Sequence, residues 1–206
     1  METGVTGVLL AGGKSRRMGE DKRFLVLGEQ TLLERGLAVL RSFFQDVLVV
    51  IAQDSPPLHV DARVVQDLVP DCGSLGGLYT GLKQAMTPCI FVVACDMPFL
   101  NRVVIAQFIS RGAAGDIVMA KLDGRLHPMH AVYGKRCLPA LEQMIQARQL
   151  KIQEVVSQPS LRVEYVTERD LSSVDPSGRS FCNVNTLADL EAARSLLART
   201  PPSGKP

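Results

Sequence analysis

Short apolar runs alternate with longer amphipathic stretches along the chain. The runs are rich in β-branched residues, as in strands that are buried on both faces of a parallel sheet. We expect five such strands, at residues 5–10, 46–52, 62–67, 89–95 and 116–121. Between them, apolar residues recur at helical spacing, which predicts helices at residues 31–44, 74–86 and 101–112. In the first helix, the apolar stripe consists of Leu32, Leu33, Gly36, Leu37 and Leu40.

This alternation of strand and helix favours an α/β fold, a three-layer α/β/α sandwich around a Rossmann-like, mostly parallel sheet. A last helix follows Asn185 or Thr186, either of which can cap it, and Asp189 suits its first turn. We expect one domain over residues 1–198. Residues 199–206 lack apolar periodicity, which predicts a disordered tail.

Composition narrows the class of partner. The formal net charge is only +2, and the chain has three tyrosines and no tryptophan, so nucleic acid is a poor candidate and a small anionic substrate a better one. There is no signal-peptide pattern and no long apolar span, so we expect no membrane contact and a cytoplasmic location. The five cysteines form no CxxC pair, which predicts reduced, mostly buried thiols.

The segment after the first apolar run, LLAGGKSRRMGEDK at residues 9–22, concentrates glycines and charges. It is not a P-loop, because the glycine required five positions before Gly13 is Val8, and it lacks the spacing of a dinucleotide fingerprint. Backbone amides at Gly12 and Gly13, with basic side chains such as Arg16 and Lys22, could still cradle a triphosphate. The alternative is a solvated, charged turn.

Two further segments end strands with a carboxylate. Asp96 follows the run at residues 89–95 and is placed to hold Mg²⁺ against phosphate oxygens. Its alternative role is to cap the helix that begins near Asn101. Asp67 ends another strand and precedes a glycine-rich turn, where Ser74 could cap a helix whose N-terminus favours an anion.

The segment GRLHPMHAVY places Arg125, His127 and His130 together before a predicted strand. Two histidines three residues apart suggest zinc, although no further ligand is evident nearby. They could instead be buried structural residues, or they could face a substrate. Asn183 and Asn185 in FCNVNT could bind a substrate through hydrogen bonds, and a helix cap is an equally good role for Asn185.

The segment LAGGKSRRMGEDK resembles the nucleotidyltransferase signature LAxGxSxRMGxxK, and the LAGG form followed by DK is similar to the molybdenum cofactor guanylyltransferases. Further matches, including CDMP around Asp96, extend to about residue 197. The resemblance implies a fold of the nucleotide-diphospho-sugar transferase type. One departure is the sequence VVIAQD after the second strand, where the family often has asparagine, so we expect no side-chain nucleotide contact from Ile51 or Gln53.

The resemblance also implies roles for individual residues. Arg16, Lys22 and Asp96 would act in catalysis, with Asp96 as the Mg²⁺ ligand. The GTP-binding set would be Leu10, Ala11, Gly12, Gly13, Lys22, Asp67, Gly76 and Asp96. The set facing the second substrate, molybdopterin, would be Arg125, His127, His130, Asn183 and Asn185.

The implied reaction is transfer of GMP from GTP to the terminal phosphate of molybdopterin, with Mg²⁺ as cofactor. A cytidylyltransferase or a sugar-phosphate nucleotidyltransferase is one alternative, since both use the same signature. A non-catalytic nucleotide-binding carrier of the cofactor is another. The resemblance further implies contacts with proteins of molybdenum insertion and molybdoenzyme maturation.

Overall fold

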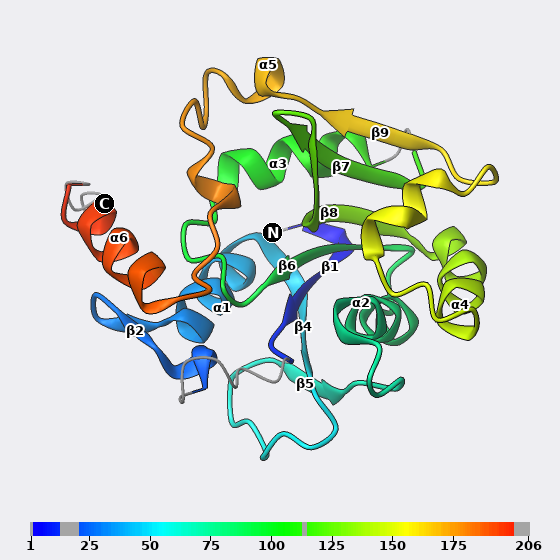
Figure 1. The fold of residues 1–206 in the computed structure, drawn as a ribbon, viewed down its shortest axis with the longest axis horizontal. Helices are drawn as coiled ribbons and strands as arrows, with labels where there is room; N and C mark the ends of the chain where they lie inside the picture. Colours follow the sequence, from blue (N-terminus) through cyan, green and yellow to red (C-terminus); the bar gives the residue numbers. More distant parts are fainter. Residues whose placement is uncertain (1, 13–20, 113–114, 200–206) are drawn as a thin grey trace.

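The computed structural model describes residues 2–12, 21–112 and 115–199, which form a central sheet with helices on both faces (Figure 1). The seven strands lie in the order β5-β4-β1-β6-β8-β7-β9. Their bounds are β1 (Glu2–Leu10), β4 (Phe44–Ile51), β5 (Arg63–Gln66), β6 (Cys89–Ala94), β7 (Ile117–Leu122), β8 (Arg125–Gly134) and β9 (Val163–Val166). All neighbours pair in parallel except those of β8, which runs antiparallel to both β6 and β7.

The helices form the two outer layers. Their bounds are α1 (Leu32–Phe43), α2 (Gly73–Gln84), α3 (Arg102–Arg111), α4 (Leu138–Gln146), α5 (Glu168–Leu171) and α6 (Leu187–Ala198). Successive side chains of β1 point to opposite faces. Leu9 packs in the core that contains residues of α1, α3 and α6, whereas Val8 and Leu10 pack in the core that contains residues of α2 and α4. The predicted three-layer sandwich is confirmed.

The first and last helices form where the sequence predicts them. The five stripe residues of α1 are all buried, and Thr31 and Glu34 form a capping box at its start. Thr186, rather than Asn185, caps α6, and Asp189 completes the capping box there. A small hairpin of β2 (Val26–Leu27) and β3 (Gln30–Thr31) precedes α1. The predicted tail lies almost wholly outside the described residues.

The sheet differs from the prediction at β8. We expected His127 and His130 to precede a strand, but both lie within β8. Polar residues interrupt the apolar run here, so the strand pattern is weak. The pairing of β8 with β7 also shifts register: Met119 pairs with Ala131, and the next residue, Ala120, pairs with His127. The sequence pattern also gave no expectation of β9 or α4.

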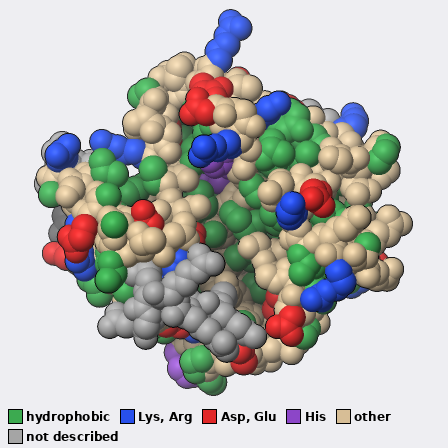
Figure 2. Space-filling view, in the orientation of Figure 1, with side chains coloured by type: hydrophobic (Ala, Val, Ile, Leu, Met, Phe, Trp, Pro, Cys, Tyr) green, Lys and Arg blue, Asp and Glu red, His purple; other side chains and the backbone are tan. Residues whose placement is uncertain are grey.

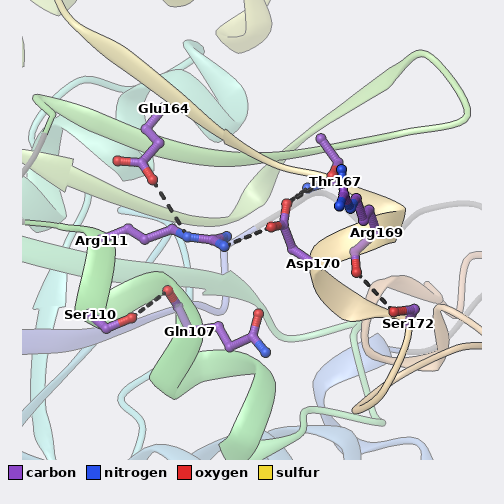
Figure 3. A network of polar contacts seen from close by, with 8 residues as sticks. All are labelled: Gln107, Ser110, Arg111, Glu164, Thr167, Arg169, Asp170 and Ser172. Atoms are coloured by element: carbon purple, nitrogen blue, oxygen red, sulfur yellow. Dashed lines mark hydrogen bonds and ion pairs between the residues drawn. The ribbon is translucent and has the colours of Figure 1, made fainter.

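An ion-pair network fixes the far edge of the sheet (Figure 3). Arg111 of α3 contacts Glu164 of β9 at 3.5 Å and Asp170 of α5 at 2.8 Å. All three side chains are about a third exposed, so each pair adds modestly to stability. Since β9 is the edge strand opposite β5, this network is structural. Among the described residues, no helix combines the length and apolar character that crossing a bilayer requires.

Candidate active site

A cavity of about 670 Å³ opens where the carboxyl ends of β1, β4 and β6 meet the start of α2. This edge of an open α/β sheet is where ligands bind. In the orientation of Figure 2, the middle of the face is hollowed, with hydrophobic side chains inside and charged ones around it. The lining includes six of the residues implicated by sequence: Leu10, Ala11, Gly12, Lys22, Asp67 and Asp96.

Backbone hydrogen bonds hold the floor of the cavity together. The Ala11 amide donates to the Val50 carbonyl at 2.8 Å, and the Cys95 amide donates to the Leu10 carbonyl at 3.0 Å. Gly12 lies next, where two backbone segments approach closely. A Cβ there would lie 3.1 Å from the Ala52 nitrogen. The candidate phosphate contacts Gly13 and Arg16 lie outside the described residues, as does the rest of the segment 13–20.

Lys22 begins a 3-10 turn, Lys22–Phe24, at the cavity wall. Asp21 caps this turn by accepting from the Arg23 amide at 3.0 Å, and the same carboxylate pairs with the Arg23 guanidinium. Arg23 is only 7% exposed, so this pair anchors the turn that carries Lys22. This pair was not predicted, although the opposite charges of Asp21 and Arg23 on either side of Lys22 are visible in the sequence.

Asp96 presents a carboxylate that protein groups leave partly unsatisfied. Its Oδ1 is buried and has no hydrogen-bond partner within the described part of the chain. Burial raises the pKa of Asp96, and the nearby Lys22 charge opposes that rise. Asn101 caps α3 through its own side chain, accepting from the Val103 amide at 2.9 Å, so the capping alternative for Asp96 does not hold.

The residues around Asp96 fit a magnesium ion. A buried carboxylate oxygen without a hydrogen-bond partner, at a cavity wall, is a hard ligand that can bind a cation such as Mg²⁺. Mg²⁺ commonly takes one or two carboxylates, with waters and substrate phosphates completing its shell. In residues 2–12, 21–112 and 115–199 there is no group of three or more His, Cys, Asp or Glu side chains that could hold a metal by themselves. A single carboxylate can hold an ion whose other ligands are waters and phosphate oxygens of a nucleotide.

Asp67 organises the turn that leads into α2. Its Oδ1 accepts from the buried Thr80 hydroxyl at 2.7 Å and from the Val69 amide at 3.0 Å. The prediction that Ser74 caps α2 is wrong, because the helix begins at Gly73 and its N-cap residue, Cys72, makes no side-chain cap. Gly73 and Ser74 line the cavity, so the first-turn amides of α2 are available to an anion there.

Gly76 is not among the residues that line the cavity, and a packing role explains its glycine. A Cβ at Gly76 would lie 2.7 Å from the Val69 carbonyl oxygen and 2.8 Å from Asp67 Oδ2. Its glycine is therefore required by the close approach of the turn at residues 67–69. The adjacent Gly77 does line the cavity, and a Cβ there would make only ordinary contact with Leu10, at 3.4 Å.

These two glycines give a matched stability prediction. We expect Gly76→Ala to lower the free energy of unfolding by about 1–3 kcal/mol, because the added methyl forces the Asp67 turn to move. Gly77→Ala should be neutral or stabilising by up to about 1 kcal/mol, since alanine favours helix over glycine. Urea unfolding of both variants makes the comparison. Equal losses from the two substitutions would contradict the packing role given to Gly76.

The histidine segment divides into a core residue and a partly accessible one. His130 has no exposed surface, and its ring packs against Phe91, Phe108 and Phe181. Burial lowers the pKa of His130 to about 3, so the ring is neutral. It is therefore a core residue and does not face a substrate. His127 is half-buried against Phe181, and burial, followed by the Arg125 charge, lowers its pKa.

The residues assigned to a second substrate lie outside the lining of the cavity. Arg125 and Asn183 are exposed, and His127 is half-buried. Asn185 is also exposed, but its Oδ1 accepts a hydrogen bond from Lys22 Nζ at 3.0 Å. This contact joins a residue of the second set to the nucleotide set. The structure therefore does not separate the two sets as cleanly as their positions in the sequence suggested.

The lining residues outside the predicted set include Arg23, Cys95 and Met129. Ile51 and Gln53 also line the cavity, so the absence of a side-chain nucleotide contact from them stays a prediction. Cys95 is not a nucleophile, because burial raises the pKa of its thiol to about 12. Met129 falls in the register shift of β8 and reaches the cavity from there. Cys72, Cys95 and Cys137 are buried, as expected, whereas Cys182 is exposed.

Known proteins match this arrangement. Residues 7–163 match the MobA-like NTP transferase domain, a span that contains the second half of β1 and every strand from β2 to β8. The chain belongs to the MobA-like NTP transferase family. Its sequence is 35% identical over 196 residues to the molybdenum cofactor guanylyltransferase of Desulfosudis oleivorans, covering 94% of this chain and 96% of that protein. The family assignment makes the protein a nucleotidyltransferase, and it confirms the resemblance carried by residues 10–22.

Solved structures agree with the MobA-like assignment. The molybdopterin-guanine dinucleotide biosynthesis protein A of Archaeoglobus fulgidus is similar at a TM-score of 0.82, with 26% identity, covering 95% of this chain and all of that one. The 2-C-methyl-D-erythritol 4-phosphate cytidylyltransferase of Thermus thermophilus is similar at a TM-score of 0.69 with 18% identity, covering 93% and 98% of the two chains. The fold is therefore of the nucleotide-diphospho-sugar transferase type.

Proposed function

We propose that this nucleotidyltransferase transfers GMP from GTP to the terminal phosphate of molybdopterin. A phosphate oxygen of molybdopterin attacks the α-phosphorus, the bond to the bridging oxygen breaks, and pyrophosphate leaves. The product is molybdopterin guanine dinucleotide. The choice of substrates is supported by similarity to the molybdenum cofactor guanylyltransferase of Desulfosudis oleivorans. The type of chemistry is supported by the residues that line the cavity.

One observation carries the proposal: Lys22 and Asp96 come from distant parts of the chain and line the same cavity as the segment from Leu10 to Gly12. A cation and an unsatisfied carboxylate at one wall suit a magnesium nucleotide. The ion held by Asp96 would supply charge neutralisation at the phosphates. Lys22, together with Arg16 from the signature, would stabilise the negative charge on the leaving pyrophosphate.

No residue is assigned as a general base. The attacking phosphate is already anionic, so the protein's contribution is alignment and charge stabilisation. The amides at the start of α2 and the backbone from Leu10 to Gly12 would hold the nucleotide. Asp67 would contact the guanosine part from the rim, and Arg125, His127 and Asn183 would face molybdopterin.

The base of the nucleotide is tested by pyrophosphate release. With Mg²⁺ and molybdopterin, we expect GTP to support turnover at least about tenfold better than ATP, CTP or UTP, a difference of about 1.4 kcal/mol. Faster turnover with CTP would favour the cytidylyltransferase alternative. Turnover that requires a sugar phosphate in place of molybdopterin would favour the sugar-nucleotide alternative. Nucleotide binding with no pyrophosphate under any of these conditions would indicate a carrier.

A further inference from the structure

Hydrogen bonds hold the backbone amides of three consecutive residues before α6, one to the active site and two to α6 itself. The buried Val184 donates its amide to the Asp96 carbonyl at 2.8 Å. The amides of Asn185 and Thr186 both donate to the Asp189 carboxylate at 2.8 Å. The backbone of Asn185 is therefore held between the active site and α6, which fixes the point from which its side chain extends.

The side chain of Asn185 contacts Lys22. Asn185 Oδ1 accepts from Lys22 Nζ at 3.0 Å, across 163 residues of sequence. An ammonium has three donors on a flexible four-carbon stem. One donor held by Asn185 restrains the stem and leaves two donors for phosphate oxygens. The Asp21–Arg23 pair fixes the backbone of Lys22, so the amide of Asn185 constrains the other end of the same side chain.

We propose that Asn185 is a positioning residue that holds the Lys22 ammonium toward the phosphates of the bound nucleotide, and that it does not serve as a contact for the second substrate. This inference rests on the proposed function, because it takes the triphosphate to be the partner of Lys22. An amide suits the task, since it is a neutral acceptor that orients the cation without cancelling its charge. A carboxylate in its place would pair with Lys22 and repel phosphate.

The test is GTP binding measured by isothermal titration with Mg²⁺ and no molybdopterin. We expect Asn185→Ala to weaken GTP binding about fivefold, in line with loss of one charge-assisted hydrogen bond at a partly exposed site. Asn185→Asp should weaken it further, to about twentyfold, because the new carboxylate neutralises Lys22. Leu187→Asp is the matched control: it adds the same charge two residues away, at a side chain that is exposed and does not line the cavity. It should change GTP affinity less than about threefold.

A double-mutant cycle tests whether Asn185 affects GTP binding through Lys22. In a Lys22→Ala background, we expect Asn185→Ala to change GTP affinity less than about twofold. Additive losses in the double variant, or unchanged GTP affinity in Asn185→Ala, would overturn the inference. If Lys22→Ala still weakens GTP binding in that case, Lys22 remains part of the nucleotide site. Wild-type protein that binds no GTP would overturn both the inference and the proposed function. Thermal melts of all variants should agree within the experimental error, because Asn185 and Leu187 are exposed.

Discussion

Asp96→Ala is expected to lower the rate of pyrophosphate release about a thousandfold at saturating GTP. A metal at the phosphates contributes several kcal/mol of charge stabilisation in the transition state, and about 4 kcal/mol corresponds to that factor. Asp96 is the described carboxylate whose buried oxygen lacks a protein partner. Asp96→Asn keeps the size of the side chain and removes its charge, so it should lose nearly as much activity. Steady-state rates over a series of Mg²⁺ concentrations provide the measurement.

Asp96→Asn is expected to leave the folded protein at least as stable as the wild type. Burial disfavours the ionised Asp96, which is why its pKa is raised. An ionised group with a raised folded pKa is destabilising above that pKa, so Asp96→Asn should not lower the free energy of unfolding at neutral pH. Activity and stability would then change in opposite directions or independently. A variant that unfolds more easily and loses activity in proportion would point to a structural role, and near wild-type turnover would remove Asp96 from the mechanism.

Lys22→Ala is expected to weaken GTP binding by about tenfold to a hundredfold, since hydrogen bonds to charged groups are worth about 1.5–3 kcal/mol. Because the ammonium also offsets the charge of the departing pyrophosphate, turnover at saturating GTP should fall as well. Higher salt should narrow the difference between variant and wild type. Titration calorimetry and initial rates measure the two effects.

Lys83→Ala is the matched control for Lys22→Ala. It removes the same charge from α2, where Lys83 contacts Glu142 at 3.4 Å and does not line the cavity. Its GTP affinity should stay within about twofold of wild type. If both lysine variants lose affinity to the same small extent, the effect is general electrostatics, and the segment around Lys22 is a charged turn without a specific role.

The sequence predicted those parts of the fold that depend on local patterns. The stripe from Leu32 to Leu40 is the buried face of an otherwise exposed helix, and the apolar β-branched runs of β1, β4 and β6 are strands buried between two layers, so both patterns were clear. The carboxyl edge of the sheet as the place of the cavity followed from topology. Asp96 could be picked out because a charge ends an otherwise apolar run.

The parts that sequence did not predict depend on tertiary contacts. His130 looks like a polar site residue, and only the packing of three phenylalanines around it makes it a core residue. Gly76 belongs to a segment that the sequence predicts as a glycine-rich turn, yet it lies in α2, where the nearness of Val69 and Asp67 explains its glycine better than a ligand does. The hydrogen bond from Lys22 to Asn185 joins residues at opposite ends of the chain, so no local pattern could reveal it.

The central claim is that GMP is joined to molybdopterin, and labelled GTP tests it most directly. With the α-phosphate of GTP radiolabelled, Mg²⁺ and molybdopterin present, the proposed reaction places the label in a new dinucleotide, with one pyrophosphate released for each dinucleotide formed. Chromatography of the quenched reaction, with mass spectrometry of the labelled peak, gives the result. Label in molybdopterin guanine dinucleotide at that ratio is the predicted outcome. Label that stays in GTP, or that appears as free GMP whether or not molybdopterin is present, would contradict the account.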